Sequence, residues 1–172
     1  SSGGVLLAQM LNMLRARPLG ELSAADRVHL LVEVMRRAYA DRAAYLGDSD
    51  YVPVPLAGLL SPAYAFRRAQ TIDMARAMPS VAPSVGTGEG RETTHFSVLD
   101  REGNRVAATL SINYPFGACF VADGTGVLLN DEMDDFSAKP GAANAYGLRG
   151  NQANAIAPGK RMLSSMSPTF VE

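Results

Sequence analysis

Thr93-Thr94-His95-Phe96-Ser97 decides the fold of this chain, because it begins the first convincing strand pattern in the sequence. The residues before it follow helical spacing, and the residues after it follow strand and loop patterns. The segment from Pro79 to Glu92, with two prolines, three glycines and almost no large apolar side chain, predicts a solvent-exposed connector. Thr-Thr is common at strand starts because threonine favours β structure. Cleavage before Thr93, however, would create a residue with both a hydroxyl nucleophile and an α-amino base.

Helical periodicity predicts three helices before the connector. The first runs from Val5 to Arg15, and the second follows an N-cap at Ser23 and ends near Leu46. The third begins at Ser61-Pro62, an N-cap followed by proline at the first helical position, and runs to about Met78.

Two strands follow the connector, at residues 93–99 and 105–112, and a turn with a Gly-Asn signal separates them. This pattern predicts a β-hairpin. Shorter extended pieces are expected at residues 118–121 and 126–129. Residues 130–167 lose regular periodicity, which is typical of either a functional or a disordered segment.

Composition excludes several classes of function. The 172 residues are 47% hydrophobic and 19% charged, with a net charge of -1, which fits a globular domain without a nucleic-acid or anionic-membrane partner. Cys119 is the only cysteine, so an intrachain disulfide is impossible, and no Cys/His cluster has metal-ligand spacing. We expect no metal, no cofactor, no transmembrane segment and no visible signal peptide. Both ends of the chain are expected to be cut from a longer protein.

Two polar motifs each allow a structural and a functional interpretation. Glu132-Met133-Asp134-Asp135 suits a solvated acidic loop, or a site for a substrate ammonium group. Ser164-Ser165-Met166-Ser167-Pro168 suits a plain turn, or a site that offers hydroxyl and backbone N–H groups to a carboxylate. His95 lies on the same strand face as Thr93, where it can orient a site or pack in a core.

Together these motifs resemble the γ-glutamyltranspeptidase family, and the resemblance covers nearly the whole chain. The residues that carry it are Thr93-Thr94-His95-Phe96-Ser97, Asn113-Tyr114-Pro115-Phe116-Gly117, Leu129-Asn130-Asp131-Glu132-Met133-Asp134-Asp135-Phe136-Ser137 and Leu163-Ser164-Ser165-Met166-Ser167-Pro168-Thr169. The N-terminal part, with Tyr39-Ala40-Asp41-Arg42, resembles the end of that family's large subunit.

The resemblance implies an α+β fold, part of the αββα sandwich of N-terminal-nucleophile hydrolases. It implies a precursor that cleaves itself between Glu92 and Thr93. Residues 1–92 would then be the helical end of the large subunit plus the connector, and residues 93–172 the start of the small, catalytic subunit. The implied partners are glutathione and other γ-glutamyl compounds, amino-acid or peptide acceptors, and the two subunits for each other.

The resemblance also assigns roles to individual residues. Thr93 is the implied nucleophile, and Ser111 takes a position where many members have threonine, so that a hydroxyl is kept beside it. The remaining implied site residues bind the substrate. Its α-amino group is bound by Asn113, Glu132 and Asp135, and its α-carboxylate is bound by Ser164 and Ser165.

Two family features lie outside the chain: an arginine upstream and an oxyanion-hole glycine pair downstream. Loss of one oxyanion-hole donor typically costs roughly 10²–10³ in rate, so the chain alone is expected to be inactive or nearly so. Family members are generally exported, which implies a periplasmic or extracellular location. Two alternatives stay open: an acylase or amidohydrolase of the same fold acting on glutaryl or poly-γ-glutamyl substrates, and a non-catalytic interaction module.

Overall fold

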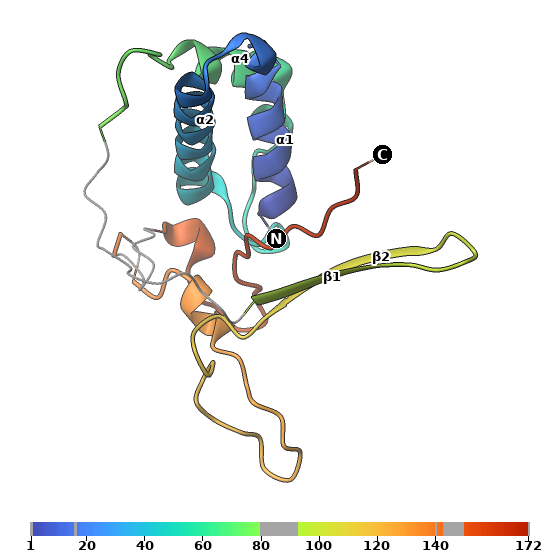
Figure 1. Ribbon diagram of the computed structural model, residues 1–172. Helices are drawn as coiled ribbons and strands as arrows, with labels where there is room; N and C mark the ends of the chain where they lie inside the picture. The colour runs from blue at the N-terminus through green and yellow to red at the C-terminus, as the bar shows by residue number, and fades with distance from the viewer. Residues whose placement is uncertain (1, 16, 80–92, 140, 143–149, 172) are drawn as a thin grey trace.

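A computed structural model describes most of the chain, with helices in the first half and a β-hairpin followed by long loops in the second (Figure 1). The described residues are 2–15, 17–79, 93–139, 141–142 and 150–171. Most of the predicted connector therefore lies outside the described residues, and so does Glu92. None of the helices in the described ranges combines the length and apolar character needed to span a membrane.

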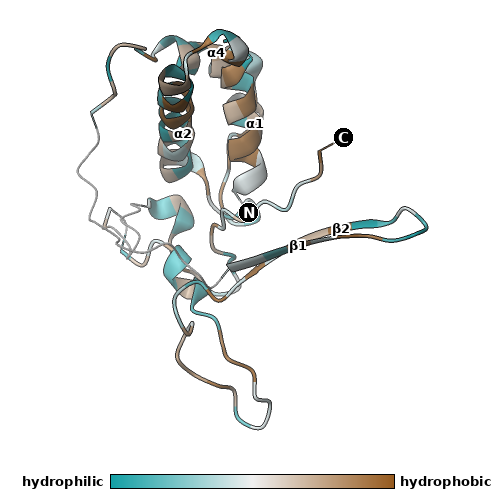
Figure 2. Ribbon diagram, in the orientation of Figure 1, coloured by the Kyte–Doolittle hydropathy of each residue, from teal (hydrophilic) through white to brown (hydrophobic). Residues whose placement is uncertain are grey.

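Helices α1 (Gly3–Leu14) and α2 (Ala24–Tyr45) lie side by side and supply nearly half of the buried core residues (Figure 1). Both were predicted close to these bounds. The Ser23 hydroxyl accepts a hydrogen bond from the Asp26 backbone N–H at 3.1 Å, which is the predicted cap of α2. Figure 2 shows hydrophobic residues over much of α1. The buried core residues come from the helices, from the residues just after α2 and α4, and from one segment near the end of the chain: Leu6, Met13, Leu30, Val34, Ala38, Leu46, Leu59, Ala65, Ala69, Ile72 and Leu163.

Helix α4 (Pro62–Gln70) is shorter than predicted. It ends at Gln70, and the predicted extension to about Met78 is wrong. Buried Arg37 of α2 explains where it ends. The Arg37 Nη2 donates to the Thr71 carbonyl at 2.6 Å, and its Nε donates to the Thr71 hydroxyl at 2.8 Å. A cation at the C-terminus of a helix satisfies carbonyls that have lost their helical partners. Short helical turns at α3 (Leu56–Leu59) and η1 (Leu19–Glu21) were not predicted.

The predicted hairpin is confirmed. Strands β1 (Thr93–Leu99) and β2 (Arg105–Ser111) pair antiparallel, with Thr93 opposite Ser111 and Leu99 opposite Arg105. Gly103 in the turn has φ 88°, a left-handed conformation that glycine adopts without steric cost. The hairpin extends away from the helices (Figure 1). Its two faces differ. Alternation places Thr93, His95, Ser97, Thr109 and Ser111 on one side, together with Leu99, Arg105 and Ala107, and places Thr94, Phe96, Val98, Val106, Ala108 and Leu110 on the other.

The second half of the chain is mostly loop. The two extended pieces predicted around residues 118–129 lie antiparallel, with an isolated bridge between Val121 and Leu128 and backbone hydrogen bonds on either side of it, but they form no regular strands. Two 3₁₀ turns follow, η2 (Glu132–Asp135) and η3 (Gln152–Asn154), and a bridge between Ser137 and Ala155 joins the segments beside them. The α+β class is as predicted. The described residues form one group of helices and one two-stranded sheet, a part of the sandwich and not all four of its layers.

Candidate functional site

Thr93 and Ser111 form a hydroxyl pair where β1 begins and β2 ends. They are direct partners in the sheet, and Thr93 Oγ1 lies 2.9 Å from Ser111 Oγ. Side chains of directly opposed residues point to the same face of an antiparallel pair. The hairpin register therefore places a second hydroxyl beside Thr93 Oγ1.

Asn113 continues the site from Ser111. Its backbone N–H donates to Ser111 Oγ at 3.0 Å, and its Nδ2 donates to the Asp131 carbonyl at 3.4 Å. Asn113 has φ 71°, in the left-handed region that asparagine enters more readily than most residues. This turn brings the end of the hairpin against the segment that leads into η2.

Glu132 and Asp135 stand three residues apart on η2, and a 3₁₀ turn places such residues on one side. Burial and the neighbouring Glu132 carboxylate raise the pKa of Asp135 to about 6, against a smaller opposing effect of Arg42. Glu132 Oε1 is buried and has no hydrogen-bond partner among the described residues. Two adjacent carboxylates, with one oxygen free, are suited to a cationic ligand.

Ser164 and Ser165 lie on a segment without helix or strand. The Ser164 carbonyl accepts hydrogen bonds from the backbone N–H and the hydroxyl of Ser2, each at 2.8 Å. Ser164 Oγ accepts from the Met166 N–H at 3.2 Å, and Ser165 is exposed. The N-terminus of α1 therefore holds the backbone of this serine motif.

Asn154 joins the acidic motif to the serine motif, and the sequence did not single it out. This buried residue donates from Nδ2 to the Asp135 carbonyl at 2.7 Å and accepts at Oδ1 from the Leu163 N–H at 3.2 Å. It lies in the region without periodicity, where no pattern distinguishes it from its neighbours. Hydrogen bonds thus run from Thr93 through Asn113 to Asp131, and from Asp135 through Asn154 to Leu163.

Both histidines have local partners. His95 is exposed on the Thr93 face, with Nδ1 2.8 Å from Thr109 Oγ1 and Nε2 3.2 Å from Ser97 Oγ, so it does not pack in a core among the described residues. His29 Nε2 lies 2.9 Å from the Asp73 carbonyl oxygen, a contact that fits a structural role.

Three groups of side chains in this arrangement differ in the chemistry that they suit. A hydroxyl with a second hydroxyl beside it is a nucleophile candidate, the carboxylates suit an ammonium group, and the serine motif suits a carboxylate. The described residues connect these three regions through hydrogen bonds, while Glu92 lies outside them.

Comparison with known proteins identifies relatives along the whole chain. The sequence model of the gamma-glutamyltranspeptidase family matches residues 1–172. A glutathione hydrolase proenzyme of Pseudomonas aeruginosa is 51% identical over an alignment of 175 positions, which covers 99% of this chain and 31% of that relative. An acylase ACY 1 proenzyme of a Pseudomonas species is 43% identical over 170 residues, or 98% of this chain and 28% of the relative.

A solved structure shares the fold. The cephalosporin acylase from Bacillus halodurans matches with a TM-score of 0.68 and 25% identity over 96% of this chain and 28% of its own. The chain thus spans about a third of the length of the curated relatives. Because the family model covers every residue from 1 to 172, the chain belongs to the γ-glutamyltranspeptidase family.

Proposed function

We propose that the full-length protein hydrolyses and transfers γ-glutamyl groups, with Thr93 as a self-generated N-terminal nucleophile. The observation that carries this proposal is the Thr93–Ser111 hydroxyl pair, 2.9 Å apart, at the start of β1. The names of two relatives, glutathione hydrolase proenzyme and acylase proenzyme, support an enzyme made as a precursor. Residues 1–92 and 93–172 would belong to its large and small subunits.

Maturation and turnover would use the same oxygen. Thr93 Oγ1 attacks the Glu92 carbonyl carbon and the peptide C–N bond breaks, which frees the Thr93 α-amine and leaves an ester on Oγ1. Water then hydrolyses this ester, which releases Glu92 as a carboxylate and regenerates the Thr93 hydroxyl. In turnover Oγ1 attacks the γ-carbonyl of glutathione, and its proton passes to the α-amine and then to the departing amine. Water, an amino acid or a peptide takes the γ-glutamyl group from the ester. The Ser111 hydroxyl orients Thr93 Oγ1 in both stages.

Recognition of the substrate would depend on opposite charges at its α-carbon. Asn113, Glu132 and Asp135 would bind the α-ammonium group, and Ser164 and Ser165 the α-carboxylate. Two observations support the assignment of these carboxylates to the ammonium group. A bound cation would give the unpartnered Glu132 Oε1 a partner, and it would offset the burial and the repulsion that raise the pKa of Asp135.

Two measurements on the full-length protein test the proposal. Mass spectrometry of the purified protein should give two chains that divide between Glu92 and Thr93. Release of p-nitroaniline should be faster from the γ-glutamyl anilide than from the glutaryl anilide, which lacks the α-amino group. A preference for the glutaryl compound would favour the acylase alternative, which the two acylase relatives support. An intact, inactive chain would favour a non-catalytic module.

Export to the periplasm or the cell exterior is also proposed. Cell fractionation with an antibody against the full-length protein tests it, and recovery in the cytoplasmic fraction alone would contradict it.

Ser111→Ala is expected to lower kcat/KM and slow precursor cleavage by roughly 10- to 100-fold, because it removes a hydrogen bond to the reacting oxygen. Ser111→Thr should keep most of the activity because it keeps the hydroxyl. Ser97→Ala, on the same face of β1, is the matched control and should leave both rates within about twofold of wild type. Full activity of Ser111→Ala would show that this hydroxyl has no role.

Acidification is expected to weaken selection for the α-amino group. The Asp135 pKa is raised to about 6, so the carboxylate that pairs with an ammonium group is lost as pH falls through that value. The measurement is the ratio of kcat/KM for the γ-glutamyl anilide to that for the glutaryl anilide, from about pH 8 to about pH 5. Effects on Thr93 cancel in this ratio. It should fall by up to about tenfold per pH unit below pH 6, and a flat ratio would contradict the assignment.

A further inference from the structure

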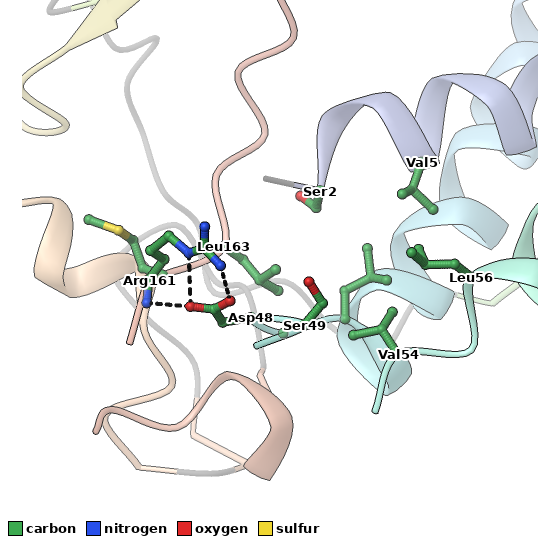
Figure 3. A pocket seen from close by; sticks show the side chains of 11 residues that line it. Ser2, Val5, Asp48, Ser49, Val54, Leu56, Arg161 and Leu163 are labelled. Atoms are coloured by element: carbon green, nitrogen blue, oxygen red, sulfur yellow. Dashed lines mark hydrogen bonds and ion pairs between the residues drawn. The ribbon is translucent and has the colours of Figure 1, made fainter. Parts of the chain in front are cut away.

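Asp48 and Arg161 form a contact between parts of the chain 113 positions apart, and neither belongs to the site proposed above. Asp48 follows α2, and its side chain is 2% exposed. It accepts three hydrogen bonds from Arg161: at Oδ2 from the backbone N–H at 2.8 Å and from Nε at 3.0 Å, and at Oδ1 from Nη2 at 2.6 Å (Figure 3). One carboxylate therefore fixes both the side chain and the backbone of Arg161.

Asp50 contacts the same guanidinium in a different way. Its Oδ2 pairs with Arg161 Nη2, but its side chain is 70% exposed, and the Arg161 backbone N–H donates to Asp48 instead. An exposed ion pair contributes little, because water competes for both charges. Arg161 thus pairs with two carboxylates, but only Asp48 also accepts a hydrogen bond from the Arg161 backbone.

The backbone held by Asp48 leads directly into the serine motif. Asp48 binds Arg161, Asn154 binds the Leu163 N–H, and Ser2 binds the Ser164 carbonyl. Residues 161–171 have no helix or strand ladder of their own. Hydrogen bonds from other segments and the burial of Leu163 therefore determine where Ser164 and Ser165 lie.

Hydrogen bonds, more than packing, hold Arg161 at the start of this segment. Asp48, Arg161 and Leu163 line a cavity of about 190 Å³, with Val5 and Val54 on its other walls (Figure 3). Leu163 packs in the core, whereas the Arg161 side chain is 66% exposed and has little packing to hold it. The Arg161 side-chain and backbone hydrogen bonds also keep the pKa of Asp48 well below its usual range, so the carboxylate stays charged at neutral pH.

We propose that Asp48 is a positioning residue for the carboxylate end of the substrate site, which it aligns by holding Arg161 and thereby Ser164 and Ser165. This inference rests on the proposed function, in which those serines bind the α-carboxylate. After cleavage between Glu92 and Thr93 the contact would also join the two subunits.

The test compares Asp48→Asn with Asp50→Asn in the full-length protein, using three p-nitroanilides. The γ-glutamyl compound has both α-groups, the glutaryl compound has only the carboxylate, and the 4-aminobutyryl compound has only the amine. Asp48→Asn should raise KM for the two carboxylate-bearing compounds by roughly 10- to 100-fold, with kcat little changed. The activity of Asp48→Asn on the 4-aminobutyryl compound should stay within about twofold of wild type. The activity of Asp50→Asn should stay within about twofold of wild type on all three compounds.

Arg161→Lys is the second variant, because it keeps the charge and the backbone N–H while removing the forked side-chain contact. It should change the same two KM values in the same direction by a smaller factor. An equal loss on all three anilides in both variants, or no difference between Asp48→Asn and Asp50→Asn, would overturn the inference. Failure of the wild-type enzyme to use the γ-glutamyl compound would instead overturn the proposed function.

Discussion

Thr93→Ala in the full-length protein is expected to remain a single uncleaved chain and to lose γ-glutamyl transfer by roughly 10⁴- to 10⁶-fold. The substitution removes Oγ1, which in the proposed chemistry attacks first the Glu92 carbonyl and then the substrate. Without cleavage the α-amine of residue 93 also stays in a peptide bond, so the base is lost with the nucleophile. Denaturing electrophoresis and p-nitroaniline release from the γ-glutamyl anilide measure the two losses.

Thr94→Ala is the matched control, because Thr94 is the adjacent threonine and pairs with Leu110 on the opposite face of the hairpin. It should be cleaved and should turn over substrate at close to the wild-type rate. Thr93→Ser should retain part of both activities, since it keeps a hydroxyl and, after cleavage, an α-amine. Cleavage and turnover by Thr93→Ala, at rates similar to Thr94→Ala, would refute the assignment of the nucleophile.

The elements that the sequence predicted well are those with local signals. The hairpin follows from two runs of β-branched and apolar residues around a Gly-Asn turn, and α2 from a capping serine ahead of an apolar stripe. The end of α4 was missed because it depends on Arg37, a residue 34 positions away that binds Thr71. Helix bounds set by a distant side chain leave no trace in local periodicity.

The same distinction applies to the site. The resemblance to the family, which contiguous motifs carry, named Thr93, Ser111, Asn113, Glu132, Asp135, Ser164 and Ser165. It did not name the residues that connect those motifs. Asn154 joins Asp135 to Leu163, and Asp48 holds Arg161 across more than half of the chain. The roles of Asn154 and Asp48 depend on the partners that folding brings to them. A single amide or carboxylate in a loop gives no sequence signal that would identify those partners.

Asp135→Asn is expected to lower kcat/KM for the γ-glutamyl anilide by roughly 10²- to 10³-fold, because truncating one partner of a buried charge pair costs about 2–5 kcal/mol. Asparagine has nearly the same shape, so the loss should come from the charge and not from packing. The glutaryl anilide has no ammonium group to bind, and its turnover should change little. The two rates together therefore separate a role in recognition from a role in folding.

Asp134→Asn is the control for Asp135→Asn, since Asp134 lies in the same 3₁₀ turn and binds the Tyr114 hydroxyl. It removes the same charge from the same turn and should leave the preference for the γ-glutamyl anilide within about tenfold of wild type. The pH profile adds a second criterion. If Asp135 with its pKa of about 6 causes the loss of selectivity in acid, Asp135→Asn should make the ratio of the two rates independent of pH. Asp134→Asn should keep the pH dependence and move it slightly toward lower pH, because the Asp134 charge adds a little to the raised Asp135 pKa. Equal losses on both anilides, or an unchanged profile in Asp135→Asn, would mean that this carboxylate stabilises the turn and does not bind the substrate ammonium.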